Sequence, residues 1–298
     1  MRTAERPVTI VSFHAHPDDE AILTAGTLAR LSAAGHRVVL VMATAGEAGL
    51  AVSSHGRGDA LAATRGEELR ASAQAIGVST VIHLGYADSG YPRPPRPRHH
   101  GEPSSAGPCA FADEEVERAA ERLASVLLDE DADILTIYDP NGGYGHPDHV
   151  QVHRVGIRAA ELARTRVVLE ATVDRTALMR VGRLLHALRR LATLPQLPDP
   201  RTIYTTRSEL THRIDVRDQW RAKRAAMQAH VSQTESDAGV RTLALFLRLP
   251  RPVFRRVFRY EWFREVGRVP GPRLLDDVLH TLAQPGVVRA GESAHPAY

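Results

Sequence analysis

The stretch Val8-Thr9-Ile10-Val11-Ser12-Phe13 decides the fold, and it runs directly into His14-Ala15-His16-Pro17-Asp18-Asp19-Glu20. The first of these runs is mostly apolar and β-branched, which is typical of a strand buried on both faces. The second run changes abruptly to histidine and carboxylates. A buried strand that ends in ionisable side chains predicts an α/β sheet with a functional site at its carboxyl edge.

Apolar runs and helical spacings alternate through the rest of the first half of the chain. Short runs rich in Val, Ile and Leu predict strands, and apolar residues three or four positions apart predict helices between them. Gly77 is expected to end one of these helices. The predicted strands are 8–13, 38–43, 81–84, 134–138 and 166–171, and the predicted helices are 21–33, 65–76, 113–128 and 149–163. This order predicts a Rossmann-like, mostly parallel sheet flanked by helices on both faces.

The last third of the chain is less regular and predicts a smaller α+β region. A strand is expected over 210–216 and a helix over 217–230. The run of arginine and aromatic residues over 254–264 favours a folded helix with one apolar face over a surface that stacks on a glycan, a nucleic acid or a partner. We therefore divide the chain into two parts. Residues 1–175 are expected to form the Rossmann-like catalytic domain, and residues 176–298 a helical and mixed region that packs on it and completes the substrate pocket.

Two segments leave alternatives open. Residues 91–108 hold six prolines among arginines and histidines, which excludes a regular helix or strand. A mobile loop beside the site, a surface insertion and a proline-rich ligand for a partner all fit this composition. Residues 180–194 form a basic amphipathic pattern, which favours packing on the protein itself over binding to a membrane surface.

The composition excludes several classes of protein. The net charge is only +3, and Lys223 is the only lysine among 38 basic residues, so the arginine content does not indicate a nucleic-acid partner. Cys109 is the only cysteine, which excludes an intrachain disulfide and a zinc site built from thiolates. No apolar run reaches the roughly 18 residues that span a bilayer, and the N-terminal residues lack the apolar core of a signal peptide. We expect a cytoplasmic protein, and a homo-oligomer is compatible with the sequence.

The first motif places three adjacent carboxylates, Asp18, Asp19 and Glu20, beside the imidazole of His16. Adjacent carboxylates repel one another unless a cation or hydrogen bonds relieve them. His16 and Asp19 are able to converge on one divalent ion if the chain turns at Pro17, and nitrogen with carboxylate oxygen suits zinc. Asp18 would then lie beside the ion as a base for water. The alternative is a helix N-terminus whose acids only cap it, but this leaves His16 unexplained.

A second motif, Asp139 to His149, follows the fourth predicted strand. Its glycines allow a tight path, and Tyr144, His146, Asp148 and His149 fall within six residues. One histidine is able to complete a catalytic site of three ligands with an open position, and the other, paired with Asp148, would be a charged acid or stabiliser. Tyr144 would donate to a developing oxyanion. The alternative is a solvated turn without a catalytic role.

Together the two motifs resemble the signatures of the PIG-L/LmbE-like deacetylases. Ala15 to Glu20 is similar to the first signature of that family, and Gly145 to His149 is similar to the second. Weaker similarity covers Thr64 to Leu69 with its Arg-x-x-Glu element, residues 75–78, 85–90 and 229–233. The longer string from Gly142 to His153 is nearest to the actinobacterial branch that handles mycothiol precursors and conjugates.

The resemblance implies a zinc-dependent hydrolase that removes an N-acyl group, in the first place N-acetyl, from a small molecule or glycosylated natural product containing an amino sugar. An amidase acting on a larger conjugate of the mycothiol type is a close alternative. A non-catalytic protein that binds a membrane surface or nucleic acid is an alternative of a different class. Against a nucleotide-binding role, no Gly-x-Gly-x-x-Gly string follows the first predicted strand.

The same resemblance implies roles for individual residues. The implied zinc ligands are His16, Asp19 and His149, with Fe²⁺ as an alternative ion. The implied catalytic residues are Asp18 as general base, His146 as acid or stabiliser, Asp148 as the group that orients His146, and Tyr144 as the donor to the carbonyl. The implied substrate contacts are Arg65 and Asp88, and the loops after the second predicted strand add Glu47 and His55 as further candidates.

Overall fold

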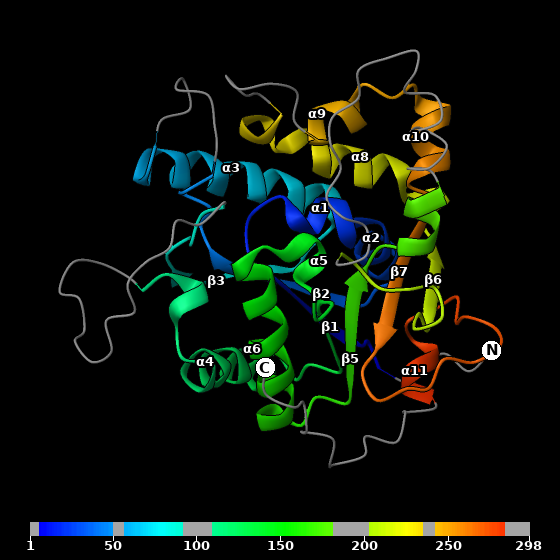
Figure 1. Ribbon diagram of the computed structural model, residues 1–298, viewed down its shortest axis with the longest axis horizontal. Helices are drawn as coiled ribbons and strands as arrows, with labels where there is room; N and C mark the ends of the chain where they lie inside the picture. Colours follow the sequence, from blue (N-terminus) through cyan, green and yellow to red (C-terminus); the bar gives the residue numbers. More distant parts are fainter. Residues whose placement is uncertain (1–5, 50–56, 92–108, 181–202, 235–241, 284–298) are drawn as a thin grey trace.

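The computed structural model describes residues 6–49, 57–91, 109–180, 203–234 and 242–283. Within these residues, seven strands form one sheet in the order β3-β2-β1-β4-β5-β7-β6. The strands are β1 (Thr9–His14), β2 (Arg37–Thr44), β3 (Thr80–Tyr86), β4 (Ile134–Tyr138), β5 (Val167–Thr172), β6 (His212–Asp215) and β7 (Tyr260–Glu265). Strands β1 to β5 pair in parallel, whereas β7 is antiparallel to both β5 and β6. The predicted Rossmann-like, mostly parallel sheet is confirmed (Figure 1).

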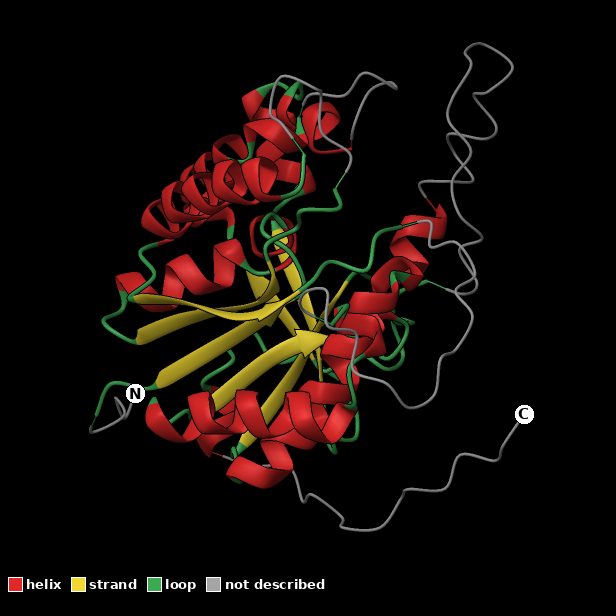
Figure 2. Cartoon of the chain, turned by 90° about the vertical axis from the view of Figure 1, so that its left-hand side faces the viewer, coloured by secondary structure: helices red, strands yellow, loops and turns green. Residues whose placement is uncertain are grey.

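Helices cover both faces of this sheet (Figure 2). They are α1 (Asp19–Leu23), α2 (Ala25–Ala33), α3 (Asp59–Ile76), α4 (Val116–Asp129), α5 (Gly142–Gly145), α6 (Pro147–Ala163), α8 (Trp220–Ala229), α9 (Thr242–Leu247), α10 (Arg251–Val257) and α11 (His280–Ala283). Gly77 ends α3 in the left-handed conformation with a φ of 81°, as predicted. Every helix among the described residues is too short or too polar to cross a lipid bilayer.

The strand that opens the sequence is buried on both sides. Ile10 belongs to the core that the sheet forms with α2, α3 and α8, whereas Val11 and Phe13 belong to the core under α4 and α6. Successive side chains of a strand point to opposite faces, so a strand covered on both faces has no position for a solvated residue. This explains why the run reads as continuously apolar, and it fixes His16 and Asp18 at the edge where the strand ends.

The C-terminal part of the chain extends the same sheet. The run 254–264, expected to form one helix, divides between the end of α10 and the strand β7, so the prediction of a single helix is wrong. The pattern of the strand shows the reason, because Glu261, Phe263 and Glu265 are buried while Tyr260, Trp262 and Arg264 are half-buried. This alternation has the period of a strand and not of a helix.

The predicted helix 21–33 is also wrong, because it breaks at Thr24 into α1 and α2. Thr24 has a φ of −128°, outside the helical range, and its N–H and Oγ1 both donate to Glu20 O at 3.2 Å. The break ends the first helix after little more than one turn. The direction of α1 is thus independent of that of α2, and the carboxylates in the first turn of α1 lie at the sheet edge.

A buried ion pair stabilises this break from the C-terminal part of the chain. Lys223 on α8 donates to Ile22 O at 2.6 Å and pairs with Glu261 Oε1 on β7 at 2.5 Å. Glu261 accepts the N–H groups of Gly26 at 2.8 Å and Thr27 at 2.7 Å. The cation therefore meets the carboxyl end of α1 and the anion meets the amino end of α2, which matches both helix dipoles. The only lysine of the chain is used at this position.

Replacing Lys223 with methionine should leave the Glu261 carboxylate buried and without its cation. We expect the free energy of unfolding to fall by about 3–5 kcal/mol, as when one partner of a buried pair is removed. The double variant Lys223→Met/Glu261→Gln should lose less than the sum of the two single variants. Urea unfolding of the four proteins measures this coupling, and strictly additive losses would contradict the pairing.

A buried histidine on β6 predicts how stability depends on pH. His212 lies between Thr211 Oγ1 and Thr281 Oγ1, each 2.8 Å from a ring nitrogen, and burial together with the charge of Arg268 lowers its pKa to about 3. Since an unfolded histidine takes up its proton near pH 6.5, the unfolded chain binds more protons than the fold between these values. Stability should therefore fall with acidification in that window, by at most about 1.4 kcal/mol per pH unit from this group.

The variant His212→Gln has no imidazole to protonate at this position. Urea unfolding between about pH 4 and 6.5 should show a shallower loss of stability for this variant than for the unmodified protein. An identical pH slope in the two proteins would contradict the assignment to His212.

Candidate metal centre

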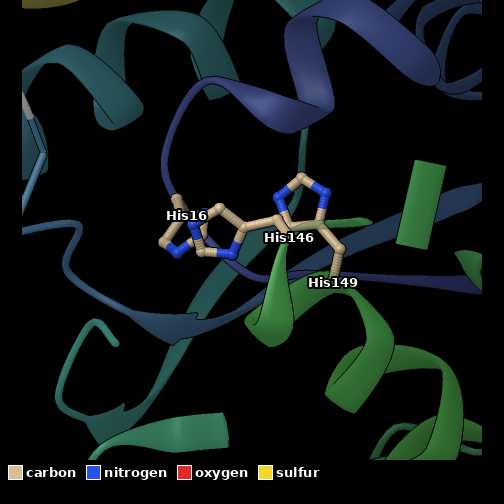
Figure 3. A group of neighbouring side chains, drawn as sticks. All are labelled: His16, His146 and His149. Atoms are coloured by element: carbon tan, nitrogen blue, oxygen red, sulfur yellow. The ribbon is translucent and has the colours of Figure 1, made fainter. Parts of the chain in front are cut away.

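The two sequence motifs meet at the carboxyl edge of the sheet. β1 and β4 are neighbouring parallel strands, so the residues that follow them emerge side by side. His16 follows β1, whereas His146 and His149 lie at the start of α6. Figure 3 shows the three imidazoles gathered at one point, and the ring centre of His16 lies 4.7 Å from that of His146 and 5.4 Å from that of His149.

Asp19 joins two of these imidazoles. Its Oδ2 lies 3.4 Å from His16 Nδ1 and 3.3 Å from His149 Nε2. Two ligands of a tetrahedral ion with bonds of about 2.1 Å are about 3.4 Å apart, so both separations are compatible with a shared cation. Burial would raise the pKa of Asp19, but the imidazoles of His149 and His16 outweigh it and hold this pKa well below its usual range.

An unpartnered nitrogen tests whether these residues suit a cation. Among the described residues, His149 Nε2 is buried and has no hydrogen-bond partner, although it faces the Asp19 carboxylate. A buried polar atom without a partner is costly, and a cation at this point would satisfy it. Ligand atoms of His16, His146 and His149 lie within 4.8 Å of one another, and those of His16, Asp88, His146 and Asp148 do so as well. The donor set therefore fits a divalent metal ion.

Asp18 holds a strained backbone conformation at this site. Its φ of 121° is one that side-chain-bearing residues rarely adopt, at a cost of about 1–3 kcal/mol. Its N–H donates to Glu20 Oε2 at 2.9 Å, and its Oδ1 lies 3.4 Å from Arg65 Nη2. Burial raises the pKa of Asp18 to about 6 against the opposing charge of Arg65. The carboxylate is thus held beside the cluster with a pKa that suits proton transfer near neutral pH.

Glu20 fixes Asp18 from inside the protein. Glu20 lies in the first turn of α1 and is fully buried. Its Oε1 pairs with His230 Nε2 and accepts from Ser72 Oγ, both at 2.6 Å. Burial would raise the pKa of Glu20, but the charge of His230 overcomes this and lowers it to about 2. A residue 210 positions later in the chain thereby anchors the strained turn.

Asp148 has different partners from those expected. Instead of pairing with His146, its carboxylate accepts from His16 Nε2 at 3.1 Å and from the N–H and Oγ of Ser89 at 3.0 and 2.5 Å. A carboxylate on Nε2 keeps the proton there, which leaves His16 Nδ1 as the atom that faces Asp19. Asp148 thus orients the imidazole of His16, from which it is separated by 132 positions in the sequence.

His146 is neutral in this arrangement. Its Nδ1 accepts the backbone N–H of Asp148 at 3.2 Å, because His146 occupies the N-cap position of α6. Burial, with further contributions from the charges of His16 and His149, lowers the pKa of His146 to about 4. The proton of the neutral ring is therefore on Nε2, whereas a charged imidazolium was expected from the sequence.

Arg65 holds the first motif and contacts its backbone. It is 3% exposed, and its guanidinium donates to Gly46 O at 2.7 Å and to Pro17 O. Three positions on, Glu68 accepts the N–H and Oγ of Ser232 at 2.6 and 2.7 Å. The Arg-x-x-Glu element thus ties α3 to both the first motif and the late segment around residue 232, which differs from the substrate contact expected for Arg65.

The other candidates for substrate contact occupy different places. Glu47 Oε1 accepts the N–H of Asp88 at 2.7 Å, so the loops after β2 and β3 are joined. Asp88 Oδ1 lies 3.4 Å from His16 Nε2 and belongs to the metal-binding cluster. The ring of Tyr144 is partly exposed with its centre 5.2 Å from that of His149. His55 lies outside the described residues.

Sequence reasoning missed two residues that organise the site. Ser89 and His230 both fall in segments that were recognised as similar to the family, but a serine in a short loop and a histidine at a helix end carry no signal of their own. Only the pairing of a buried carboxylate with each of them shows their role.

Comparison with known proteins identifies relatives over most of the chain. The profile of the PIG-L family, described as GlcNAc-PI de-N-acetylase, matches residues 11–160. A protein of Thermobispora bispora named 1D-myo-inositol 2-acetamido-2-deoxy-alpha-D-glucopyranoside deacetylase is 34% identical, over 91% of this chain and 91% of its own. A protein of the same name from Acidothermus cellulolyticus is 33% identical over 86% of this chain and 87% of its own.

Solved structures share the fold. The N,N'-diacetylchitobiose deacetylase of Pyrococcus horikoshii superimposes with a TM-score of 0.53 at 23% identity, covering 87% of this chain and 83% of its own. The zinc-inhibited form of a teicoplanin deacetylase gives a TM-score of 0.52 at 17% identity, over 87% of this chain and 97% of its own. At these identities the likeness establishes the α/β architecture.

If the cluster holds a divalent cation, that ion should stabilise the fold. A protein freed of metal with a chelator and returned to a cation at 100 times its Kd should gain about 2.7 kcal/mol in the free energy of unfolding. His149→Ala should abolish this gain, whereas His83→Ala, which changes an exposed histidine on β3, should keep it. An equal gain in the His149 variant would remove this residue from the site.

Proposed function

The chain belongs to the PIG-L family of de-N-acetylases, and from that premise we propose that it hydrolyses the N-acetyl amide of an amino sugar carried on a small molecule. One observation carries the proposal. A half-buried aspartate in a strained conformation, Asp18, lies beside a carboxylate that two imidazoles share. This arrangement combines a base with a cation site, which are the two groups that metal-assisted hydrolysis of an amide by water uses.

We assign zinc as the cation and His16 Nδ1, Asp19 Oδ2 and His149 Nε2 as its ligands. Two imidazoles and one carboxylate are a frequent donor set for catalytic zinc, and Fe²⁺ is the alternative for the same donors. When bound, the ion supplies Lewis acidity, which polarises the acyl oxygen and lowers the pKa of water. Asp148 supports this set, because its bond to His16 Nε2 turns the opposite nitrogen of that ring toward Asp19.

Asp18 takes the proton of the attacking water. Arg65 faces its Oδ1 at 3.4 Å, which leaves Oδ2 to accept the proton. The pKa of about 6 means that the carboxylate is ionised at neutral pH and yet holds a transferred proton long enough to return it. Since the neutral His146 keeps its only proton on Nε2 as a hydrogen-bond donor, Asp18 is the better donor to the leaving amine.

His146 and Tyr144 stabilise the charge that develops on the acyl oxygen. His146 offers Nε2–H, because its Nδ1 is occupied by the N–H of Asp148. The Tyr144 hydroxyl stays protonated, since burial and then the charges of Asp19 and Asp18 raise its pKa. Two neutral donors aimed at an oxyanion act without prior reorganisation of charge.

The substrate class follows from the relatives. Those of at least 33% identity described above are named as deacetylases of N-acetylglucosamine joined to inositol, and we propose a glycoside of N-acetylglucosamine with a ring-shaped polar aglycone as the substrate here. Release of acetate from this compound, measured against free N-acetylglucosamine, tests the assignment. Release of a larger acyl group without acetate would favour the amidase alternative.

Replacing Asp18 with asparagine should reduce turnover by about 10²–10⁴-fold, since the base is lost while the ligands remain. Metal content should not change. The control Asp59→Asn alters an exposed acid in the first turn of α3 and should keep full turnover. Full turnover of the Asp18 variant would overturn the role of this residue.

A further inference from the structure

Tyr91 lies at the metal centre beside Tyr144, and the reaction described above gives it no role. Among the described residues, the exposed tyrosine, phenylalanine and tryptophan side chains are Tyr91, at 50%, and Tyr144, at 40%. Both lie against His146, with ring centres 5.2 and 6.1 Å from that of the imidazole. Aromatic rings left open to solvent beside convergent polar groups are characteristic of ligand-binding surfaces.

The rings meet at a definite angle. Tyr91 is inclined by 37° to His146, whereas Tyr144 is nearly perpendicular to both, at 77° to Tyr91 and 78° to His146. The centres of the two tyrosine rings are 6.0 Å apart. Together they form a corner with one ring along each side, which offers both a face and an edge to a flat, weakly polar group.

The backbone holds Tyr91 at this place. Ser89 donates its N–H and Oγ to Asp148, and Gly90 donates its N–H to Asp88 Oδ1 at 2.8 Å. Gly90 has a φ of 72°, a conformation that suits glycine, and Tyr91 follows it directly. The loop after β3 is thus tied to the same carboxylates that surround His16, so that Tyr91 is positioned before any ligand binds.

The order of the rings indicates what Tyr91 contacts. Tyr144 lies next to His149, with ring centres 5.2 Å apart, and Tyr91 contacts Tyr144 and His146, with ring centres 6.0 and 5.2 Å apart. If the acetamido group lies at the metal centre, as the proposed function requires, the anomeric carbon is one of the two ring carbons next to the carbon that carries this group. We propose that Tyr91, with Tyr144 beside it, binds the ring attached at the anomeric carbon and makes the enzyme selective for ring-bearing glycosides of N-acetylglucosamine.

This inference rests on the proposed function, and its test separates the two. The substrates are the methyl and the 4-nitrophenyl glycosides of N-acetylglucosamine, which share the amino sugar and differ in the aglycone, a methyl group in one and an aryl ring in the other. The unmodified enzyme should release acetate from both, with a lower KM for the aryl glycoside. Lack of acetate release from either glycoside and from the inositol glycoside would overturn the proposed function itself.

The variant Tyr91→Ala should raise the KM for the aryl glycoside by about 2- to 10-fold, the size of one aromatic contact, while the KM for the methyl glycoside stays unchanged. For both substrates kcat and the metal content should be unchanged, because Tyr91 does not contact the reacting atoms. The matched variant Tyr91→Phe keeps the ring and should retain the preference.

Two results would overturn the inference while leaving the proposed function intact. An equal rise of both KM values would place the Tyr91 ring against the amino sugar and not against its aglycone. A fall in kcat or in metal content without a change in the ratio of the KM values would reduce Tyr91 to a packing partner of His146.

Discussion

The structure depends on the placement of three consecutive carboxylates at the end of one strand, where Glu20 is fully buried and Asp18 and Asp19 are half-buried. Asp18, Asp19 and Glu20 cannot all be ionised in a low-dielectric environment unless each has a cationic partner. The fold provides a separate partner for each of them. Arg65 of α3 lies beside Asp18, the imidazoles that follow β1 and open α6 flank Asp19, and His230 after α8 pairs with Glu20. These partners come from four different parts of the chain, so the site and the packing of the sheet form together.

The C-terminal part of the chain is consequently part of the site. His230 anchors Glu20, and through it the N–H of Asp18. Lys223 and Glu261 stabilise the helix break that aims α1 at the sheet edge. The strands β6 and β7 continue the same sheet, which brings Glu261 under the amino end of α2. Residues beyond position 200 thus determine the backbone conformation of a turn near position 18.

The sequence predicted those features that depend on local pattern. The five parallel strands and the meeting of the two motifs followed from apolar runs and from the rule that functional loops gather at the carboxyl edge. The break at Thr24 could not be read in this way, because the apolar spacing continues through it and its cause, the Lys223–Glu261 pair, is about 200 positions away. The partner of Asp148 was missed for the same reason, since a nearby histidine in the sequence is not the imidazole that the fold brings to its carboxylate.

At the metal centre, the carboxylates of the first motif and the exposed Tyr91 have two different tasks. Asp18, Asp19 and Glu20 owe their charges and orientation to partners inside the protein, and a change to any of them disturbs several elements at once. Tyr91 is held by its own loop, through Ser89 and Gly90, and by ring contacts with Tyr144 and His146, and half of its side chain faces solvent. A substitution at Tyr91 therefore changes the surface that a substrate contacts without changing the metal-binding residues or Asp18. Selectivity among amino-sugar glycosides is thus able to change at this position while the chemistry of the buried groups is maintained.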